Sequence, residues 1–315
     1  MDELIAQAET AALSANTHKT YRTGWNSWAR WAAANGQKIA KATVKNIQRW
    51  LADLYRQGKK MATLRTYLAA VAYKLRSRAG TNPARDHRVR LLLAGLARDA
   101  AERGITTRQA GPLRREHIQR IAAAVSAPRR NQPGGRLETP EQARERADAD
   151  IAMLAVGHNA LLRCSELLAL TWNDIDHPPD GGLATIWIRR SKTDQNGEGA
   201  AVAIFEYASQ ALARLRKAVA NPDARIFDFS PSTARRRIKA AARDAGIDTA
   251  NISTHSLRVG MAQDLAASGI NMSGLMLAGR WHSPKTAALY IRRVQAQHTP
   301  AAQHLKTQQP PIPCS

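Results

Sequence analysis

A tyrosine near the C-terminus follows a group of residues that suits chemistry on a phosphate. Within residues 254–294, His255 and Arg258 are three positions apart, so both side chains project from one face at the start of a predicted helix. Trp281 follows, and Tyr290 comes nine residues later, in a second amphipathic helix. A tyrosine hydroxyl can act as a nucleophile, and neighbouring cations can stabilise charge that develops on phosphate oxygens. The spacing therefore allows attack on a phosphate, but spacing alone does not decide it.

The alternative for Tyr290 is a structural role, which is the usual one for a tyrosine in an amphipathic helix. Tyrosines at core-like helical spacing, which indicates packing, are Tyr21, Tyr55, Tyr67 and Tyr73. Tyr290 is the tyrosine that lies close in sequence to a histidine, an arginine and a tryptophan. Because a phenol has a reference pKa of about 10, a nucleophilic tyrosine also needs a nearby cation or base.

Six residues, taken in order, match the active-site pattern of a known family: Arg163, Lys192, His255, Arg258, Trp281 and Tyr290. This order resembles the Arg, Lys, His-x-x-Arg, His/Trp and Tyr pattern of the tyrosine recombinase (phage integrase) family. The tryptophan, together with the segments HSLRVGMAQDLAASGI and MLAGRW, is most similar to the Cre recombinase branch. The resemblance is strong over residues 150–300 and loose before residue 110.

The resemblance implies a role for each residue. Tyr290 would be the nucleophile, and Arg163 and Arg258 would clamp the scissile phosphate, because one guanidinium group can bind two phosphate oxygens. Glu166 lies three residues after Arg163, at a position that is acidic in the family, and would orient it. Lys192 would be the general acid that protonates the departing 5′ oxygen. Without the resemblance, a lysine in a loop is simply solvated.

Two further side chains complete the expected site. His255 would hydrogen-bond the phosphate or exchange a proton with the tyrosine, since histidine titrates near neutral pH. Trp281 would donate its indole N–H to the phosphate and pack against the site. His282 would replace Trp281 if the register shifted by one residue. We favour Trp281, which lies nine residues before Tyr290 as the family pattern requires.

The composition indicates a polyanionic partner. The 315 residues include 47 Lys and Arg against 25 Asp and Glu, a net charge of +22, which favours nucleic acid. Charge alone does not separate a sequence-specific protein from a ribosomal-type or chromatin-packing protein. The basic residues predicted to contact DNA are Lys19, Arg22, Lys45, Arg65, Arg235, Arg236, Arg237 and Lys239. The alternative is that these side chains are only solvated helix faces.

Several other classes of protein are disfavoured. The two cysteines, Cys164 and Cys314, allow neither a disulfide framework nor a cysteine zinc site. The nine histidines are scattered and no phosphate-cradling loop is evident, so no cofactor is expected. No apolar run approaches the roughly 20 residues of a membrane span. The N-terminus lacks the layout of a signal peptide, which predicts a cytoplasmic protein of a bacterial cell or phage-infected host.

Helical periodicity predicts an N-terminal bundle over residues 1–104. Apolar residues recur at helical spacing in four segments, residues 16–35, 43–57, 61–78 and 84–103. Four helices with short connections and no strand signal are typical of a small bundle. Residues 105–113 contain glycine, threonine and proline and form the predicted linker.

The second domain, residues 114–293, is predicted to be mainly α as well. Its first helical segments are residues 114–126, an interrupted helix over 139–162, and 163–170. The β-prone segments 184–190 and 201–205 predict a hairpin with Lys192 at its tip, and helices resume at residue 208. Ser283 and Pro284 mark the start of the last helix. A polar tail follows over residues 294–315, with a short helix around 300–305.

Taken together, the resemblance implies a SAM-like core-binding bundle and an α-rich catalytic domain that close on DNA as a C-shaped clamp. The expected reaction is site-specific recombination through a 3′-phosphotyrosyl intermediate and a Holliday junction. Its partners would be double-stranded DNA with a palindromic site and three further copies of the chain, linked by tail helices that dock into neighbours. The alternatives are a Xer-type recombinase or phage integrase that needs accessory factors, a type IB topoisomerase, and a basic DNA-binding protein without catalysis.

Overall fold

Two units follow one another along the chain, residues 1–107 and 108–315. The computed structural model describes residues 1, 4, 7, 12–39, 41–76, 82–105, 109–130, 134–177, 183–189, 198–216 and 221–297. Lys192, at the expected hairpin tip, and residues 298–315 of the expected tail lie outside these ranges. What was predicted for them therefore stays a prediction.

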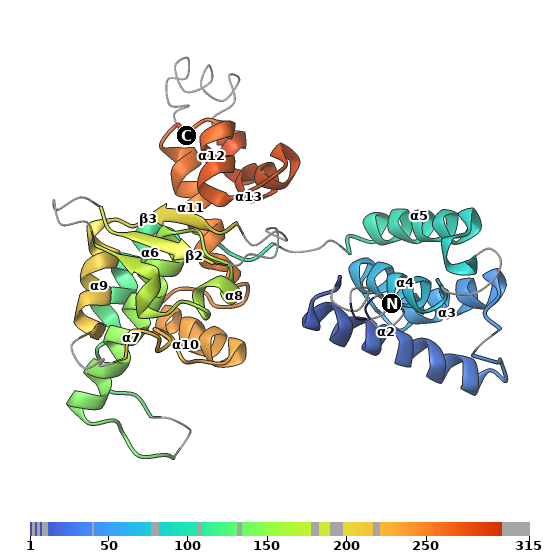
Figure 1. Ribbon diagram of the computed structural model, residues 1–315, viewed down its shortest axis with the longest axis horizontal. Coiled ribbons are helices and arrows are strands. Elements are labelled where there is room, and N and C mark those ends of the chain that lie inside the picture. The colour runs from blue at the N-terminus through green and yellow to red at the C-terminus, as the bar shows by residue number, and fades with distance from the viewer. Residues whose placement is uncertain are drawn as a thin grey trace, which may run out of the picture. The chain divides into compact units, whose positions relative to one another are not determined.

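Within its described residues, the first unit is built of helices joined by turns and contains no strand (Figure 1). Its elements are α2 (Ala15–Ala34), α3 (Val44–Arg56), α4 (Met61–Lys74), η1 (Pro83–Arg85) and α5 (His87–Glu102). The side chains of Ser14 and Thr43 accept backbone hydrogen bonds at the starts of α2 and α3, which explains where these helices begin. The core contains Trp28 and Trp50, both fully buried. At Gly24, a β-carbon would lie 2.8 Å from the β-carbon of Ala70, so glycine allows α2 and α4 to pack closely.

The second unit combines helices with one small sheet. Its helices are α6 (Arg115–Ala124), α7 (Pro140–Asn159), α8 (Cys164–Leu167), η2 (Trp172–Asp174), α9 (Glu206–Arg216), α10 (Pro231–Asp244), α11 (His255–Ala267), α12 (Met272–Gly279) and α13 (Pro284–Gln297). Its strands are β1 (Ile175–Asp176), β2 (Thr185–Ile188) and β3 (Ala200–Ala203). The mainly α architecture with a small antiparallel sheet confirms the predicted fold class. Among the described residues, no helix combines the length and apolar composition needed to cross a membrane.

The sheet is antiparallel, in the order β1-β2-β3. Ile186 of β2 pairs with Val202 of β3, as expected for the predicted hairpin, while β1 was not predicted. Ile186 and Ile188 are buried and Trp187 between them is 48% exposed, so one face of β2 covers the core.

Helix α7 runs without a break through the centre of the second unit, so the predicted interruption is wrong. Its start is fixed by a capping box, in which Thr139 and Gln142 satisfy each other's backbone N–H groups, and by Pro140 in the first turn. Every residue from 152 to 159 is buried. Gly157 lies where Leu257 contacts the helix, and a β-carbon there would approach Leu257 within 2.7 Å. This glycine therefore permits close packing and does not end the helix.

Helices α11, α12 and α13 share a separate small core, and they lie together at one end of the unit (Figure 1). This core contains Leu161, Met261, Leu275, Trp281 and Ile291. α12 was not predicted, and α8 is shorter than the helical segment expected over 163–170. The three-helix cluster holds α13, and hence Tyr290, against the start of α11.

Candidate active site

Tyr290 and His255 form a direct hydrogen-bonded pair. The Tyr290 hydroxyl on α13 lies 2.8 Å from Nε2 of His255, the first residue of α11. His255 keeps contact with solvent, yet burial of its ring and the charges of Arg258 and Arg163 lower its pKa. Its neutral form is therefore favoured at neutral pH, and a neutral imidazole can accept the tyrosine proton.

Trp281 buttresses this pair. Its ring centroid lies 4.7 Å from that of Tyr290, and only 6% of the residue is exposed. The guanidinium carbon of Arg258 lies 4.6 Å from the Trp281 ring centroid, within the range of a cation–π contact. His282, the alternative for this position, is exposed. Trp281 is thus the residue that packs against Tyr290.

Arg258 lies deeper than expected for a residue that clamps a phosphate. It is fully buried, and its two terminal nitrogens donate to the carbonyl oxygens of Leu161 and Gly279. Burial, followed by the charge of Arg163, lowers its pKa to about 10, so the group remains a cation at neutral pH. Arg258 therefore places positive charge beside the Trp281 ring, while both terminal nitrogens of its guanidinium are hydrogen-bonded to backbone carbonyls.

Arg163 and Glu166 form an ion pair at the start of α8. Arg163 Nη1 donates to Glu166 Oε1 at 2.6 Å, and the Arg163 backbone N–H donates to Oε2 at 2.9 Å. Glu166 is only 3% exposed. Burial by itself raises its pKa, but the hydrogen bonds from Arg163 and the charge of Arg280 outweigh burial and hold the pKa below its usual value. Glu166 is therefore an ionised carboxylate that holds Arg163 in place.

Arg280 belongs to the same cluster and was missed by sequence reasoning. Its Nη2 lies 3.0 Å from Glu166 Oε2, and its guanidinium also donates to the carbonyls of Ala160 and Leu161 at 3.2 and 3.3 Å. Its only sequence signal is its place directly before Trp281 in the segment MLAGRW. No local pattern indicated that it would turn towards residues 160–166.

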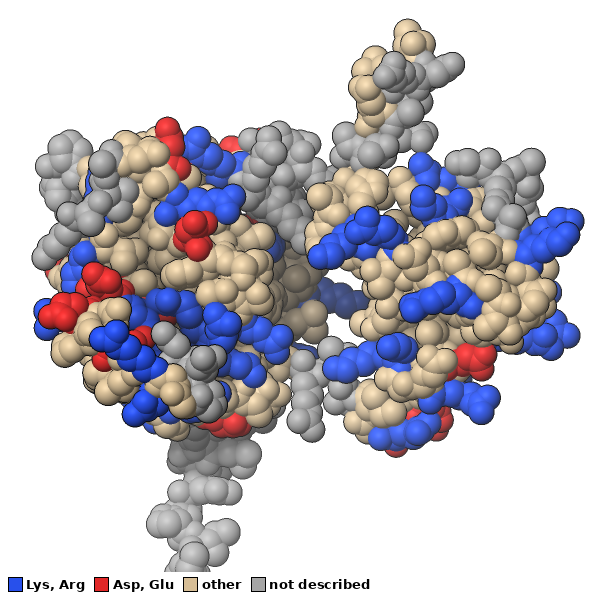
Figure 2. All heavy atoms as spheres, turned by 90° about the horizontal axis from the view of Figure 1, so that it is seen from below, with Lys and Arg blue, Asp and Glu red and all other residues tan. Residues whose placement is uncertain are grey.

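The predicted DNA-contacting residues fall into two groups. Six are exposed: Lys19, Arg22, Lys45, Arg65, Arg235 and Arg236. Figure 2 shows one face of the molecule, on which Lys and Arg side chains outnumber Asp and Glu in both units. Lys239 and Arg237 are half-buried. Arg237 Nε donates to the fully buried carboxylate of Asp150 at 2.7 Å, so its guanidinium holds α10 on α7 and the expected phosphate contact is not supported.

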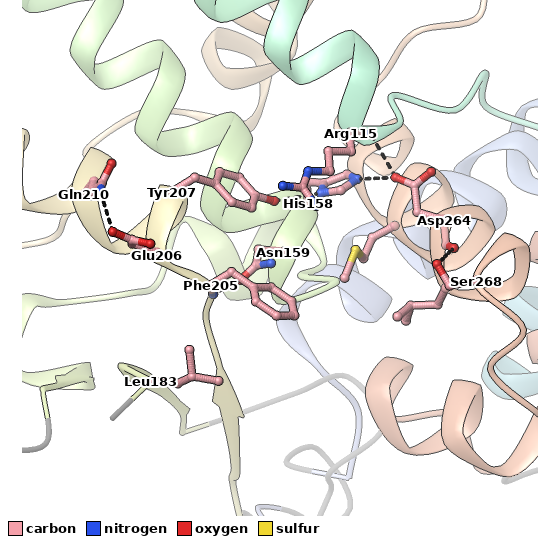
Figure 3. Close-up of a pocket in the computed structure, with 12 residues that line it drawn as sticks. Arg115, His158, Asn159, Leu183, Phe205, Glu206, Tyr207, Gln210, Asp264 and Ser268 are labelled. Atoms are coloured by element: carbon pink, nitrogen blue, oxygen red, sulfur yellow. Dashed lines mark hydrogen bonds and ion pairs between the residues drawn. The ribbon is translucent and has the colours of Figure 1, made fainter. Parts of the chain in front are cut away.

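The second unit also contains a cavity of about 620 Å³, lined by residues of α7, α9 and α11 among others (Figure 3). Among the predicted catalytic residues that the structure describes, none lines this cavity. On its wall, buried His158 lies 3.1 Å from the Tyr207 hydroxyl and 3.1 Å from a carboxylate oxygen of Asp264. Asp264 also accepts hydrogen bonds from the Arg114 side chain and the Arg115 backbone, which ties α6, α7 and α11 together. Within the described part of the chain, no group of three or more His, Cys, Asp or Glu residues is placed to hold a metal ion.

Comparisons with known proteins place these features in a family. Residues 113–297 match the phage integrase family, and residues 7–75 match the N-terminal SAM-like domain of phage integrases. The recombinase Cre of Escherichia phage P1 is 24% identical over 311 residues, covering 91% of this chain and 86% of that protein. The integrase/recombinase XerD homolog of Selenomonas ruminantium is 24% identical over 299 residues, covering 88% and 82%.

Solved structures share the fold. The Tn1549 transposon integrase in complex with transposon right end DNA superimposes with a TM-score of 0.60 at 14% identity, covering 94% of each chain. A lambda integrase dimer bound to a core site gives a TM-score of 0.58 at 18% identity, covering 92% of this chain and 93% of that one. The family match spans more than half of the chain and contains Tyr290, His255, Arg258 and Trp281. The chain therefore belongs to the phage integrase family and is a tyrosine site-specific recombinase.

Proposed function

We propose that this recombinase cuts and rejoins double-stranded DNA by forming a covalent bond between Tyr290 and a 3′ phosphate. The hydrogen bond between the Tyr290 hydroxyl and His255 Nε2 carries the proposal, because it joins a nucleophile to a neutral base beside a cluster of guanidinium groups. Tyr207 and His158 form a second tyrosine–histidine pair, but that histidine also contacts the carboxylate of Asp264, whereas the Tyr290 pair lies beside Trp281 and the cation of Arg258.

The reaction balances without a cofactor. The Tyr290 oxygen attacks the scissile phosphorus, and the bond from phosphorus to the 5′ oxygen breaks. The phenolic proton passes to His255, and the departing 5′ oxygen receives a proton, for which Lys192 is the proposed donor. The phosphotyrosyl bond conserves the energy of the broken phosphodiester, so a 5′ hydroxyl from a partner strand can reverse the step and join to it.

Exchange of two duplexes needs two rounds of this chemistry, through a Holliday junction. Four strands are cut, so we propose a homotetramer on two copies of a palindromic site, with both units of each chain bound to DNA. Cre and the XerD homolog are equally similar to this chain at 24% identity, so a recombinase that acts alone and one that requires accessory proteins are both compatible with the relatives.

The test is covalent capture. The purified chain would be incubated with sheared bacterial genomic and plasmid DNA, denatured in detergent, and the DNA that stays attached to protein would be sequenced. The wild type should yield adducts at one site, and Tyr290→Phe should yield none while still binding DNA. Tyr207→Phe is the matched control, because it also loses a hydroxyl from the second unit and should retain adduct formation. Absence of any wild-type adduct would favour a non-catalytic DNA-binding protein.

A second experiment separates the reaction types. A supercoiled plasmid with two copies of the mapped site should be resolved or inverted, and a plasmid without the site should remain supercoiled. Relaxation of both plasmids without exchange would indicate a topoisomerase. Recombination that requires added cell extract would indicate the accessory-dependent, Xer-type alternative.

A further inference from the structure

Two non-glycine residues of the described chain adopt the left-handed backbone conformation, and a hydrogen bond joins the side chain of one to the backbone carbonyl of the other. Leu161 has φ +47° and Arg280 has φ +53°. Glycine normally occupies such positions, because a β-carbon there is strained. The carbonyl of Leu161 accepts a hydrogen bond from Arg280 Nη2 and another from Arg258 Nη1. Strained residues persist where surrounding contacts hold them, and they concentrate at functional sites.

The Arg280 side chain connects two segments that each carry a site residue. It begins at the C-terminal end of α12, directly before Trp281, and it reaches the segment that leads into Arg163. There it shares one carboxylate with Arg163: Glu166 Oε1 bonds Arg163, and Oε2 bonds Arg280 at 3.0 Å. With 14% of its side chain exposed and its terminal nitrogens donating to protein oxygens, Arg280 is not placed to bind a phosphate itself.

The charges of this cluster suit the reaction. Three guanidinium groups, those of Arg163, Arg258 and Arg280, accompany one carboxylate, Glu166, which gives the four residues a net charge of +2. Without Arg280, Glu166 would neutralise Arg163 and the net charge would be +1. A phosphodiester carries one negative charge, and attack by a deprotonated tyrosine produces a five-coordinate phosphorus with two. Fixed charge is most effective when it matches the charge of the transition state.

We propose that Arg280 is a positioning residue for strand cleavage, which rests on the function proposed above. By sharing Glu166, it leaves Arg163 with net positive charge to direct at the phosphate, and it fixes the Trp281 loop against the Arg163 segment. Arg280 acts through Glu166 and Arg163 and does not touch the DNA.

The test uses three substitutions at this position. Arg280→Met removes the charge, Arg280→Lys retains it, and Arg280→Gly removes the side chain while accommodating the left-handed backbone. Arg144→Met, on the exposed face of α7, is the matched control for loss of one positive charge. The probe is a nicked duplex carrying the mapped site, which traps the covalent adduct. The single-turnover cleavage rate at saturating DNA, the DNA concentration at half-saturation and the melting temperature are measured for each.

We expect Arg280→Met and Arg280→Gly to slow cleavage about 10- to 100-fold, as for the loss of preorganised charge, while half-saturation changes less than about threefold. Arg280→Lys should recover most of the rate, and Arg144→Met should cleave like the wild type. If Arg280→Met fails to fold, Arg280→Gly decides.

Two results would overturn the proposal: an Arg280→Gly variant that cleaves within twofold of the wild-type rate, or an Arg280→Lys variant as slow as Arg280→Gly. A rate loss that only tracks the melting temperature would also count against it, as a purely structural effect. Failure of the proposed function is distinguishable, because the wild-type chain itself would then form no adduct.

Discussion

Replacing Glu166 by glutamine should destabilise the second unit at neutral pH. The Glu166 side chain is 1% exposed and lies 2.6 Å from Arg163 and 3.0 Å from Arg280. Removing one partner of a buried ion pair costs roughly 3–5 kcal/mol, because the remaining charge is buried without compensation. Glutamine keeps the shape and one acceptor oxygen, so we expect a loss of about 3 kcal/mol, at the lower end of that range. For a unit of this size, such a loss lowers the melting temperature by about 6–12 °C.

The loss should depend on pH in a defined direction. The pKa of folded Glu166 lies below its usual value, as described above. A carboxyl group with a depressed folded pKa stabilises the protein at pH values above its unfolded pKa, and this contribution disappears as the pH falls towards the folded pKa. The difference in stability between the wild type and Glu166→Gln should therefore be complete at pH 7 and shrink below about pH 4.3.

Scanning calorimetry of the full-length chain between pH 7 and about pH 3 would measure this difference, because the loss occurs below the unfolded pKa of about 4.3. Glu145→Gln, which changes an exposed glutamate of α7, is the matched control and should melt within about 1–2 °C of the wild type. Equal melting temperatures of Glu166→Gln and the wild type at pH 7, or an undiminished difference at about pH 3, would refute the assignment of Glu166 as a buried, ionised counter-charge.

Three further predictions concern packing, proton transfer and DNA contact. Gly260→Ala should lower stability by at least about 3 kcal/mol in thermal melts, because its β-carbon would lie 1.8 Å from a backbone oxygen. Gly95→Ala, in an open helical position, should instead raise stability by about 0.5–1 kcal/mol. If both substitutions changed stability by the same amount, the close packing described at Gly260 would be wrong. Cleavage by the wild type should slow only at pH values below the ordinary histidine pKa of about 6.5, because burial and the charges of Arg258 and Arg163 lower the pKa at which His255 becomes protonated. In His255→Gln this acidic decline should vanish and the rate should drop about 100-fold, and a retained decline would assign it to another group. Arg236→Met should reduce the slope of log affinity against log salt by about 0.9, measured by fluorescence anisotropy. Arg237→Met should leave that slope unchanged and lower the melting temperature, because its guanidinium binds Asp150. A reduced slope for Arg237→Met together with an unchanged slope for Arg236→Met would assign the phosphate contact to Arg237.

Local signals accounted for much of the fold. Apolar periodicity predicted a helix over 43–57, and α3 spans Val44–Arg56. The Ser283–Pro284 pair predicted the start of α13 at Pro284, which the structure confirms. α12 escaped prediction because this short helix is apolar over much of its surface, with Leu275 buried but Leu277 81% exposed, so no single face stood out. The interruption predicted within residues 139–162 was wrong, because α7 is continuous from Pro140 to Asn159 and its Gly157 allows close packing against Leu257.

The site was predictable in its residue types and less so in its geometry. The order of residues indicated that Tyr290 and His255 belong together, and the structure joins them by a hydrogen bond. The burial of Arg258 could not be predicted, because its partners, the carbonyls of Leu161 and Gly279, come from distant segments. Arg280 occupies a left-handed backbone position, which a sequence reveals only when glycine or asparagine occupies it.

The hydrogen bond between Tyr290 and His255 closes within one polypeptide, because α13 folds back onto α11 of its own chain. Under the function proposed above, each copy should therefore use its own Tyr290 and His255 to break the strand to which it is itself bound, in cis. We then expect that an intact copy cannot supply its tyrosine to a Tyr290→Phe neighbour. In a mixed population, the number of broken strands should fall in direct proportion to the fraction of defective copies, and two differently defective variants should fail to complement one another.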